Sequence, residues 1–195
     1  MVRGDCGAEA RTYECSAFGV RLIAKAREPK RYRVKALDEE LRRSRTRREA
    51  RILYALRERR IPVPSVVAVG RNIIYMERLE GRLLRDVRKG PAFFESVGEV
   101  VGDMHDAGVA HGDMTPANIM VVKGRPYIID FGLAEMTGSV EEKALDLLLM
   151  KRSLGGMEYA AFLSGYSSGN RNYGKVMERL SGIEKRGRYQ VRTLA

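Results

Sequence analysis

Apolar residues recur along this chain with two spacings, and the shorter spacing predicts strands. Over residues 8–24 apolar and polar positions alternate, which predicts a β-hairpin because neighbouring side chains of a strand point to opposite faces. Short apolar runs at 65–69 and 73–76 flank a turn at residues 70–72 and predict a second hairpin. Residues 26–37 between these hairpins are basic and irregular.

The longer spacing, with apolar residues every three or four positions, predicts helices. The longest covers residues 38–60, where Ile52, Leu53 and Leu56 form the apolar stripe. Acidic residues at its start suit the positive end of a helix dipole, and Pro62 follows its end. The other expected elements are a short helix near 83–87, a helix over 92–107, a hairpin from 119–122 and 127–129, a helix over 140–154, and shorter helices over 157–166 and 173–184.

This order of elements predicts an α+β fold with two lobes that share a cleft. Residues 1–77 would form an N-lobe of strands plus one long basic helix. Residues 78–195 would form a minimal, mostly helical C-lobe, with the boundary near residues 77–81. A chain of 195 residues is long enough for two such lobes.

Basic side chains are concentrated in the N-lobe. The chain carries a net charge of +11, and residues 21–60 alone hold 16 basic and 6 acidic side chains. Residues 95–150 hold 10 acidic and 3 basic side chains, and the end of the chain is basic again. Clusters of this size suit phosphate backbones, so we expect RNA or another polyanion as a partner. The alternative is a solvated, arginine-rich helix face.

Sequence signals that would direct the chain to a membrane are missing. No run approaches the roughly 18 consecutive apolar residues of a membrane span, and the first residues lack the apolar segment of a signal peptide. Cys6 and Cys15 are the only cysteines, which gives neither a disulfide framework nor a four-ligand zinc pattern. We expect a cytoplasmic protein with free thiols and no membrane partner.

The chemistry is concentrated in a His-Gly-Asp motif that ends at Asp113, in Asn118, and in an Asp-Phe-Gly motif that begins at Asp130. Phosphoryl transfer from a magnesium nucleotide needs an Asp that accepts or orients the proton of the attacking oxygen. It also needs oxygen ligands that hold the metal on the phosphates. The spacing suits Asp113 for the first role and Asn118 and Asp130 as Mg²⁺ ligands.

Two residues of the N-lobe complete a kinase-like set, so we expect the two lobes to form a bilobal protein-kinase-like fold. Lys25 ends an apolar strand, from which a lysine can reach the α- and β-phosphates of ATP. Glu49 falls on the buried stripe of the long helix, where an unpaired carboxylate is costly and needs a cationic partner. Lys25 is the expected partner. Arg27 or Arg48 could also serve, and a solvated position for Glu49 at the edge of the stripe remains open.

Three further polar residues near these motifs are expected to have structural roles. Asp146 lies within an apolar helical run, from which its side chain can brace the backbone of the loop that carries Asp113. We expect His111 to orient backbone rather than to act as a general base. His105, on an apolar helix, is expected to be a hydrogen-bonded packing residue.

The two segments that a protein kinase uses around its substrates are both reduced. No G-x-G-x-x-G loop occurs, and Gly7, Ala8 and Glu9 are the candidates to contact the nucleotide through their amides. Only residues 133–139 separate the Asp-Phe-Gly motif from the next helix, where an ordinary protein kinase has an activation segment and a peptide platform. Water can therefore be the phosphate acceptor, and Asp113 would orient it.

These blocks resemble the small atypical kinase of the KEOPS complex, a family whose members work in making threonylcarbamoyl-adenosine on tRNA. The resemblance covers nearly the whole chain, although Met114 stands where the family usually has Leu. The block at 30–33 and the basic tail are its specific parts, since His-Gly-Asp with Asn also occurs in small-molecule kinases. The matching blocks are 7–10, 30–33, 37–38, 45–50, 75–77, 111–113 with Asn118, 129–133, 142–144 with Asp146, 162–163, 165–166 and 186–188.

The resemblance implies ATP and Mg²⁺ as cofactors and a role largely as an ATPase. It implies as partners a larger ATP-binding, tRNA-modifying subunit of KEOPS, a small accessory subunit, and tRNA. The tRNA would bind through the helix at 38–60 and the tail at 185–189. The implied site residues are Lys25 and Glu49 as the ion pair, Glu77 and its neighbours as the adenine hinge, Asp113 as the catalytic residue, and Asn118 and Asp130 as metal ligands.

Two other functions fit part of the sequence. A small-molecule phosphotransferase also carries His-Gly-Asp, but it would need an enlarged C-lobe with an acidic substrate pocket, for which 195 residues leave little room. An RNA-binding scaffold with a vestigial nucleotide site would not need the complete set of site residues. We therefore expect an atypical serine/threonine kinase-like ATPase that supports tRNA modification.

Overall fold

The first part of the chain folds into a five-stranded antiparallel sheet with the order β1-β2-β3-β5-β4. The computed structural model describes the backbone of residues 4–6, 10–17 and 19–192, and the side chains of residues 10–17 and 19–186. Both expected hairpins are present, and β1 is an edge strand that the spacing did not predict. The strands are β1 (Gly4–Cys6), β2 (Arg11–Ala17), β3 (Val20–Ala26), β4 (Val66–Val69) and β5 (Ile73–Glu77).

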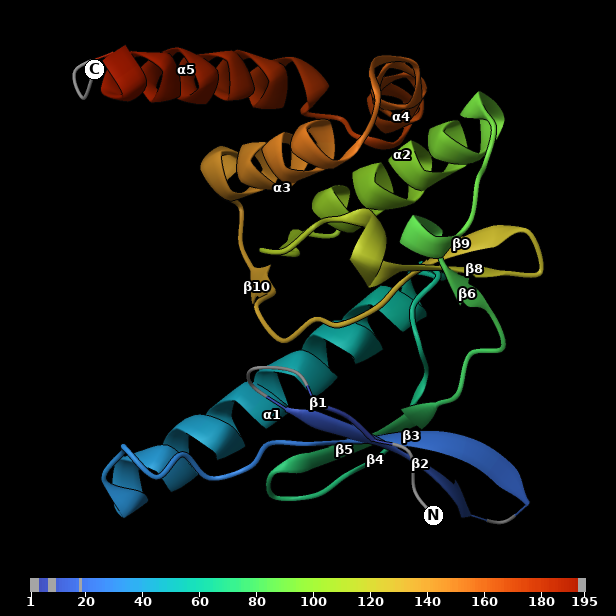
Figure 1. Ribbon diagram of the computed structural model, residues 1–195, viewed down its shortest axis with the longest axis vertical. Coiled ribbons are helices and arrows are strands. Elements are labelled where there is room, and N and C mark those ends of the chain that lie inside the picture. Colours follow the sequence, from blue (N-terminus) through green and yellow to red (C-terminus); the bar gives the residue numbers. More distant parts are fainter. Residues whose placement is uncertain (1–3, 7–9, 18, 193–195) are drawn as a thin grey trace.

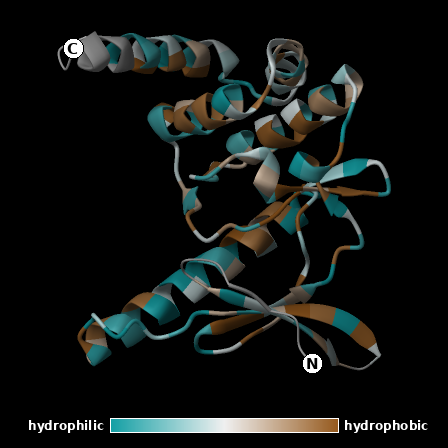
Figure 2. Cartoon of the chain, viewed as in Figure 1, coloured by the Kyte–Doolittle hydropathy of each residue, from teal (hydrophilic) through white to brown (hydrophobic). Residues whose placement is uncertain are grey.

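The long helix α1 (Lys35–Glu58) runs from beside this sheet to the junction with the rest of the chain (Figure 1). Its predicted stripe is confirmed, because Ile52, Leu53 and Leu56 are at most 2% exposed. These three residues belong to the same hydrophobic core as the helices of the C-lobe. The helix is correspondingly hydrophobic where it approaches that lobe (Figure 2). The helix therefore ties the two halves of the molecule together.

The rest of the chain is mostly helical, as expected, with two small sheets. One of them contains the hairpin predicted from 119–122 and 127–129, which is formed by residues 119–122 and 125–128. One sheet has the order β6-β8-β9, and the other pairs β10 with β7. The elements are β6 (Arg82–Leu83), the 3₁₀ helix η1 (Leu84–Asp86), α2 (Pro91–Asp106), β7 (Val109–Ala110), the 3₁₀ helix η2 (Pro116–Asn118), β8 (Ile119–Val122), β9 (Arg125–Ile128), β10 (Glu135–Met136), α3 (Val140–Ser153), α4 (Gly156–Gly169) and α5 (Tyr173–Arg192).

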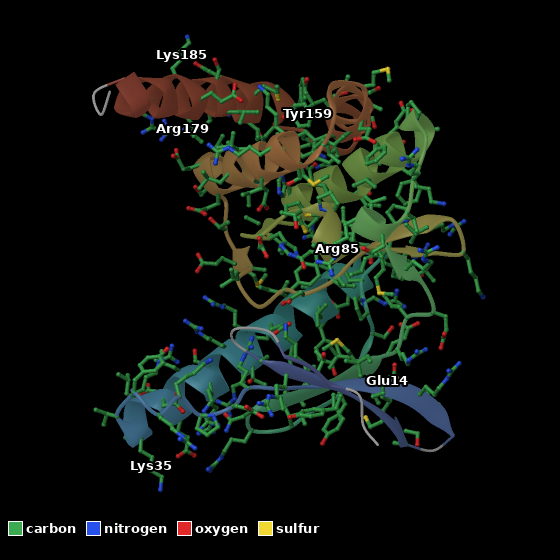
Figure 3. The ribbon with its side chains drawn as sticks, viewed as in Figure 1. Glu14, Lys35, Arg85, Tyr159, Arg179 and Lys185 are labelled. Atoms are coloured by element: carbon green, nitrogen blue, oxygen red, sulfur yellow. The ribbon has the colours of Figure 1, made fainter. Side chains whose placement is uncertain are left out.

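Helix α5 is longer than predicted. The apolar spacing ends near residue 184, but the helical backbone continues to Arg192, because Lys, Arg and Gln beyond that point are good helix formers. The segment 185–189 is therefore helical. Arg179 lies on the side of α5 that faces α3 (Figure 3), where it and Arg186 both pair with Glu141. These ion pairs dock the described part of the basic tail on α3.

Helices α2 and α4 cross at backbone contact because glycines lie at the crossing. A Cβ atom on Gly98 would lie 2.0 Å from the carbonyl oxygen of Phe162, and one on Gly165 would lie 1.8 Å from that of Glu95. This close approach brings Tyr166 of α4 against His105 of α2. Among the described residues, no helix is both long and apolar enough to cross a membrane.

Candidate nucleotide site

A cleft of about 330 Å³ lies between the sheet and the C-lobe, within the range of small-molecule sites. One end is apolar and suits a planar base, and the other carries lysine and carboxylate groups that suit metal-bound phosphates. Glu14 on β2 (Figure 3) pairs with Arg78 across its mouth at 3.0 Å. The lining residues are Thr12, Glu14, Ile23, Lys25, Glu49, Leu53, Pro64, Met76, Glu77, Arg78, Leu79, Gly81, Met120, Ile129, Asp130 and Phe131.

The expected contact between Lys25 and Glu49 is present. Lys25 Nζ lies 2.6 Å from Glu49 Oε1, and both side chains are almost fully buried. Glu49 also forms an ion pair with Arg27, whose Nη2 lies 2.6 Å from Glu49 Oε2. Two of the candidate cations therefore hold this carboxylate together. The third, Arg48, pairs with Glu135 on β10 instead.

Asp130 lies at the C-lobe side of the cleft in a strained conformation. Its φ of 61° is uncommon for a residue with a Cβ atom and recurs at functional sites. Its Oδ1 accepts hydrogen bonds from Lys25 Nζ at 2.7 Å and from the backbone N–H of Gly132 at 3.2 Å. Burial alone would raise the pKa of Asp130, but the charge and hydrogen bond of Lys25 outweigh it and leave that pKa lowered. Asp130 is therefore an ionised acceptor.

Asp113 and Asn118 lie together on the loop between β7 and β8. The Asn118 side-chain amide donates to Asp113 Oδ2 at 2.9 Å and to the Asp113 carbonyl at 2.8 Å, which leaves its amide oxygen available to a cation. The Ile129 N–H donates to the Asn118 carbonyl at 2.9 Å. This backbone contact holds Asn118 beside the residue that precedes Asp130.

The backbone of the Asp113 loop is braced from beneath, as predicted for Asp146 and His111. The Asp146 carboxylate accepts the His111 N–H at 2.6 Å and the Gly112 N–H at 2.9 Å. His111 Nδ1 accepts the Asp113 N–H at 3.3 Å, and its Nε2 lies 3.0 Å from the Ile129 carbonyl. Both ring nitrogens are thus occupied, which leaves neither for general-base chemistry.

His105 extends this brace into the C-lobe core. Its Nε2 lies 3.1 Å from Asp146 Oδ2 and its Nδ1 lies 2.8 Å from the Tyr166 hydroxyl. Complete burial lowers the pKa of His105 despite the neighbouring Asp146 carboxylate. The neutral ring therefore donates to Asp146 from Nε2 and accepts from Tyr166. The sequence predicted a packing role for His105 but gave no sign of its partner on α4.

Asp130 in the cleft lining and the donors of the adjoining loop that carries Asp113 and Asn118 fit a magnesium ion that is shared with a nucleotide. Among the described side chains, no three His, Cys, Asp or Glu residues gather as a self-sufficient metal site would require. Mg²⁺ in nucleotide sites needs less, namely one or two carboxylates with phosphate oxygens and water. The ionised Asp130 and the amide oxygen of Asn118 are ligands of that kind, and the carboxylate of Asp113 lies against Asn118.

Glu77 lines the apolar end of the cleft, although its carboxylate is already engaged. Its Oε2 accepts the N–H and the hydroxyl of Ser65 at 3.2 and 2.9 Å. The Glu77 N–H also donates to the Ser65 carbonyl, at 2.8 Å. An adenine would therefore have to meet the Glu77 carbonyl or the main chain beyond it rather than the Glu77 side chain. Gly7, Ala8 and Glu9, the candidates to cover the phosphates, lie outside the described residues.

A small strand-rich lobe, a helical lobe and this cleft define a protein-kinase-like phosphotransferase. The fold matches that of the crystal structure of the Rio2 kinase from Chaetomium thermophilum, with a TM-score of 0.69. The match covers 95% of this chain and 72% of that chain at 18% identity. The predicted α+β, bilobal kinase-like fold is confirmed.

The chain belongs to the RIO domain family, whose model matches residues 18–151, and within it to the Bud32-like atypical kinases. It is 36% identical to the KEOPS complex subunit Bud32 of Pyrococcus abyssi over 96% of both chains. It is 40% identical to a probable serine/threonine-protein kinase BUD32 homolog of Archaeoglobus fulgidus over 88% of this chain and 90% of that protein. The chain is therefore an ATP-dependent phosphotransferase.

A longer relative contains a region similar to almost the whole chain. This is a probable bifunctional tRNA threonylcarbamoyladenosine biosynthesis protein of Methanothermobacter thermautotrophicus, 35% identical over 94% of this chain. The chain spans only 36% of that protein. The similarity therefore concerns one part of the bifunctional protein.

Proposed function

We propose that this chain hydrolyses ATP in support of threonylcarbamoyladenosine formation on tRNA, as a subunit of a KEOPS complex. The observation that carries hydrolysis is the segment after the Asp-Phe-Gly motif. It pairs with β7 through β10 only three residues after Gly132 and enters α3 at Val140. The described chain thus has no extended surface at this point on which a peptide acceptor would be held, whereas water needs none.

The side chains of the cleft and of the adjoining loop with Asp113 and Asn118 would supply each role that hydrolysis requires. Asp113, held by Asn118 and by its own braced backbone, would orient the attacking water and accept its proton. Lys25 would hold the phosphates, with Glu49 fixing its position. Asn118 and Asp130 would hold Mg²⁺, which when bound neutralises charge that develops on the phosphate oxygens. The backbone at Glu77 would bind the adenine edge.

A basic groove beside the cleft supports the RNA part of the proposal. It has a volume of about 720 Å³ and lies between α1 and β10. Arg43, Arg47 and Arg51 recur every four residues along one face of α1 and are exposed, and Arg48 and Glu135 also line the groove. Arginine rows of this kind suit a phosphate backbone. The tail at 185–189 would add further contacts.

The names of the relatives support the choice of partners. We propose a larger ATP-binding, tRNA-modifying subunit and a small accessory subunit of KEOPS as partners. In support, one relative is named a KEOPS complex subunit and another is named for threonylcarbamoyladenosine biosynthesis. A function on tRNA agrees with the cytoplasmic location expected from the sequence.

The hydrolytic role is tested by following labelled γ-phosphate from ATP to water, protein or RNA, with the purified chain alone and with tRNA. Asp113→Ala should lower Mg²⁺-dependent release of phosphate at least about 100-fold, as removal of a positioned acid or base does. Asp86→Ala, which removes an exposed carboxylate of the same lobe, serves as the matched control. Equal turnover in the two variants would exclude the role assigned to Asp113.

The RNA role is tested by the salt dependence of tRNA binding. Replacing Arg43, Arg47 and Arg51 by Gln should weaken binding and reduce the slope of log K against log salt by about 2–3, the loss expected for three phosphate contacts. Replacing the exposed arginines 82, 85 and 88 makes the same change in charge outside the groove. If both triple variants weaken binding equally, the groove has no special role.

A further inference from the structure

Four charged side chains of the cleft form one continuous chain of contacts across three elements. Arg27 contacts Glu49 at 2.6 Å, Glu49 contacts Lys25 at 2.6 Å, and Lys25 contacts Asp130 at 2.7 Å. Each carboxylate oxygen of Glu49 has its own cation. The lysine that serves the phosphates is thus shared between two carboxylates, and the arginine at the end of the chain touches only one of them.

Arg27 is placed to act on Glu49 and not on the nucleotide itself. It follows β3 directly, two residues after Lys25, and its backbone N–H bonds to the Asn72 carbonyl at 2.9 Å. Because successive side chains of a strand point to opposite faces, residues two positions apart share a face. Lys25 and Arg27 therefore lie on the same face of the sheet. Lys25, Glu49 and Asp130 line the cleft, whereas Arg27 is not one of its lining residues and its side chain is 4% exposed.

The Arg27 guanidinium is held in this position at a cost. Its Nε is buried and has no hydrogen-bond partner among the described residues, and burial of a guanidinium carries a large desolvation penalty. It also lies close behind the metal-site segment, since a Cβ atom on Gly132 would come within 3.9 Å of its Nη2. An apolar residue would fill the same space without these penalties, so the charge itself has a use.

The use follows from what nucleotide binding would demand of Lys25. To contact phosphates, Lys25 must leave Asp130 and share its charge between Glu49, which fixes its position, and the phosphates. Glu49 is only 2% exposed, so a lysine that was its sole partner would then leave this buried carboxylate incompletely compensated, which is destabilising. With Arg27 on the other oxygen, the charge of Glu49 stays compensated while Lys25 binds the phosphates.

We propose that Arg27 is a positioning residue for nucleotide binding, which neutralises Glu49 so that Lys25 can transfer from Asp130 to the phosphates. This inference rests on the phosphate contact assigned to Lys25 in the proposed function. Arg27 would affect nucleotide binding only through its contact with Glu49. The Arg27 charge should therefore matter only while Glu49 carries its own charge.

The test is a double-mutant cycle in the full chain with the Kd for Mg-ATP, kcat and KM as readouts. Arg27→Met should raise Kd and KM on the order of tenfold, within the coupling expected for contacting charges, with a smaller change in kcat. Arg27→Lys, which keeps the charge, should restore most of the affinity. With Glu49→Gln in place, Arg27→Met should change Kd by less than about twofold. Arg71→Met, which removes an exposed partner of Glu39 on α1, is the control.

Thermal unfolding without nucleotide gives a second test of the same pairing. Lys25→Met should lower Tm only slightly because Glu49 keeps Arg27. The double variant Lys25→Met with Arg27→Met should lower Tm by at least about 6 °C more than the two single changes together, the consequence of an unpaired buried charge. Additive Tm losses would refute the shared pairing.

The outcomes separate this inference from the proposed function. An unchanged Kd in folded Arg27→Met, or an equal loss in the Glu49→Gln background, overturns the inference while the phosphate role of Lys25 stands. If Lys25→Met itself binds Mg-ATP as tightly as the unaltered chain, the role assigned to Lys25 fails, and the inference fails with it.

Discussion

Replacement of Asp146 by Asn tests whether the catalytic loop depends on one buried carboxylate. Asp146 is fully buried and accepts three hydrogen bonds, from the backbone N–H groups of His111 and Gly112 and from the ring of His105. An asparagine has one acceptor oxygen. If that oxygen replaces Oδ2, its NH₂ group faces the Gly112 N–H, and if it replaces Oδ1, two donors lose their acceptor.

The magnitude follows from this count. A buried donor left unpaired costs about 1–3 kcal/mol, and hydrogen bonds to a charged acceptor are worth more than those to an amide. Asp146→Asn should therefore destabilise the fold by about 2–5 kcal/mol. For a chain of this size each kcal/mol lowers Tm by about 2–4 °C, so the expected loss is roughly 5–15 °C. Turnover should fall at least about tenfold, since small misplacements at a reacting centre are costly.

Circular dichroism melts and phosphate release measured well below the Tm of the variant are the appropriate assays. Asp86→Asn makes the same chemical change at an exposed position and should leave both quantities unchanged. A Tm within 2 °C of the unaltered chain together with normal turnover would refute the reasoning. It would mean that the loop holds Asp113 in place without the brace.

Three further predictions concern the lobes and their junction. The pKa of Asp130 is lowered in the folded chain, so its ionised form stabilises the fold at pH values above the unfolded-state pKa of about 3.9. The unaltered chain should therefore have a higher Tm than Asp130→Asn at pH 7, and this difference in Tm should shrink as the pH falls below about 4. Thermal melts between pH 7 and pH 3 would measure it. Gly98→Ala should destabilise the fold by about 1–3 kcal/mol, because the added methyl group overpacks α2 against α4. Gly182→Ala should stabilise α5 by up to about 1 kcal/mol, because the space at its Cβ is open. Denaturant titration measures both changes. Arg48→Ala should cost less than about 1 kcal/mol by the same method, because its partner Glu135 is 60% exposed.

The parts of the site that the sequence could predict are those carried by local motifs. Asp113 and Asn118 are five residues apart on one loop, so a single short stretch defines their contact. Asp130 follows one hairpin later, and its strand neighbours fix it beside them. The brace by Asp146 was also predictable, because a carboxylate within an apolar helical run must find donors. In each case residue type and spacing restricted the choice to one arrangement.

What the sequence could not predict depends on distances between separate elements. Lys25, Arg27 and Arg48 were all candidates for Glu49, and nothing in the spacing shows that two of them bind it at once. The contact between His105 and Tyr166 depends on how closely α2 and α4 approach, which the glycines at the crossing determine. Strands of two residues, such as β7 and β10, are too short to produce a periodic pattern.

The pairing of β10 with β7, which the sequence did not predict, bears directly on the choice between hydrolysis and transfer to a peptide. β7 leads through Ala110 directly into His111, and β10 begins three residues after Gly132, so one ladder joins the two segments that carry Asp113 and Asp130. In a peptide kinase the segment after the metal-binding Asp leaves this region to form the surface for the acceptor. Here the segment is used at once to close the loop around Asp113. In a site assembled in this way the proposed base and metal ligands are fixed but there is little provision for a peptide, which is why we favour hydrolysis over transfer to protein.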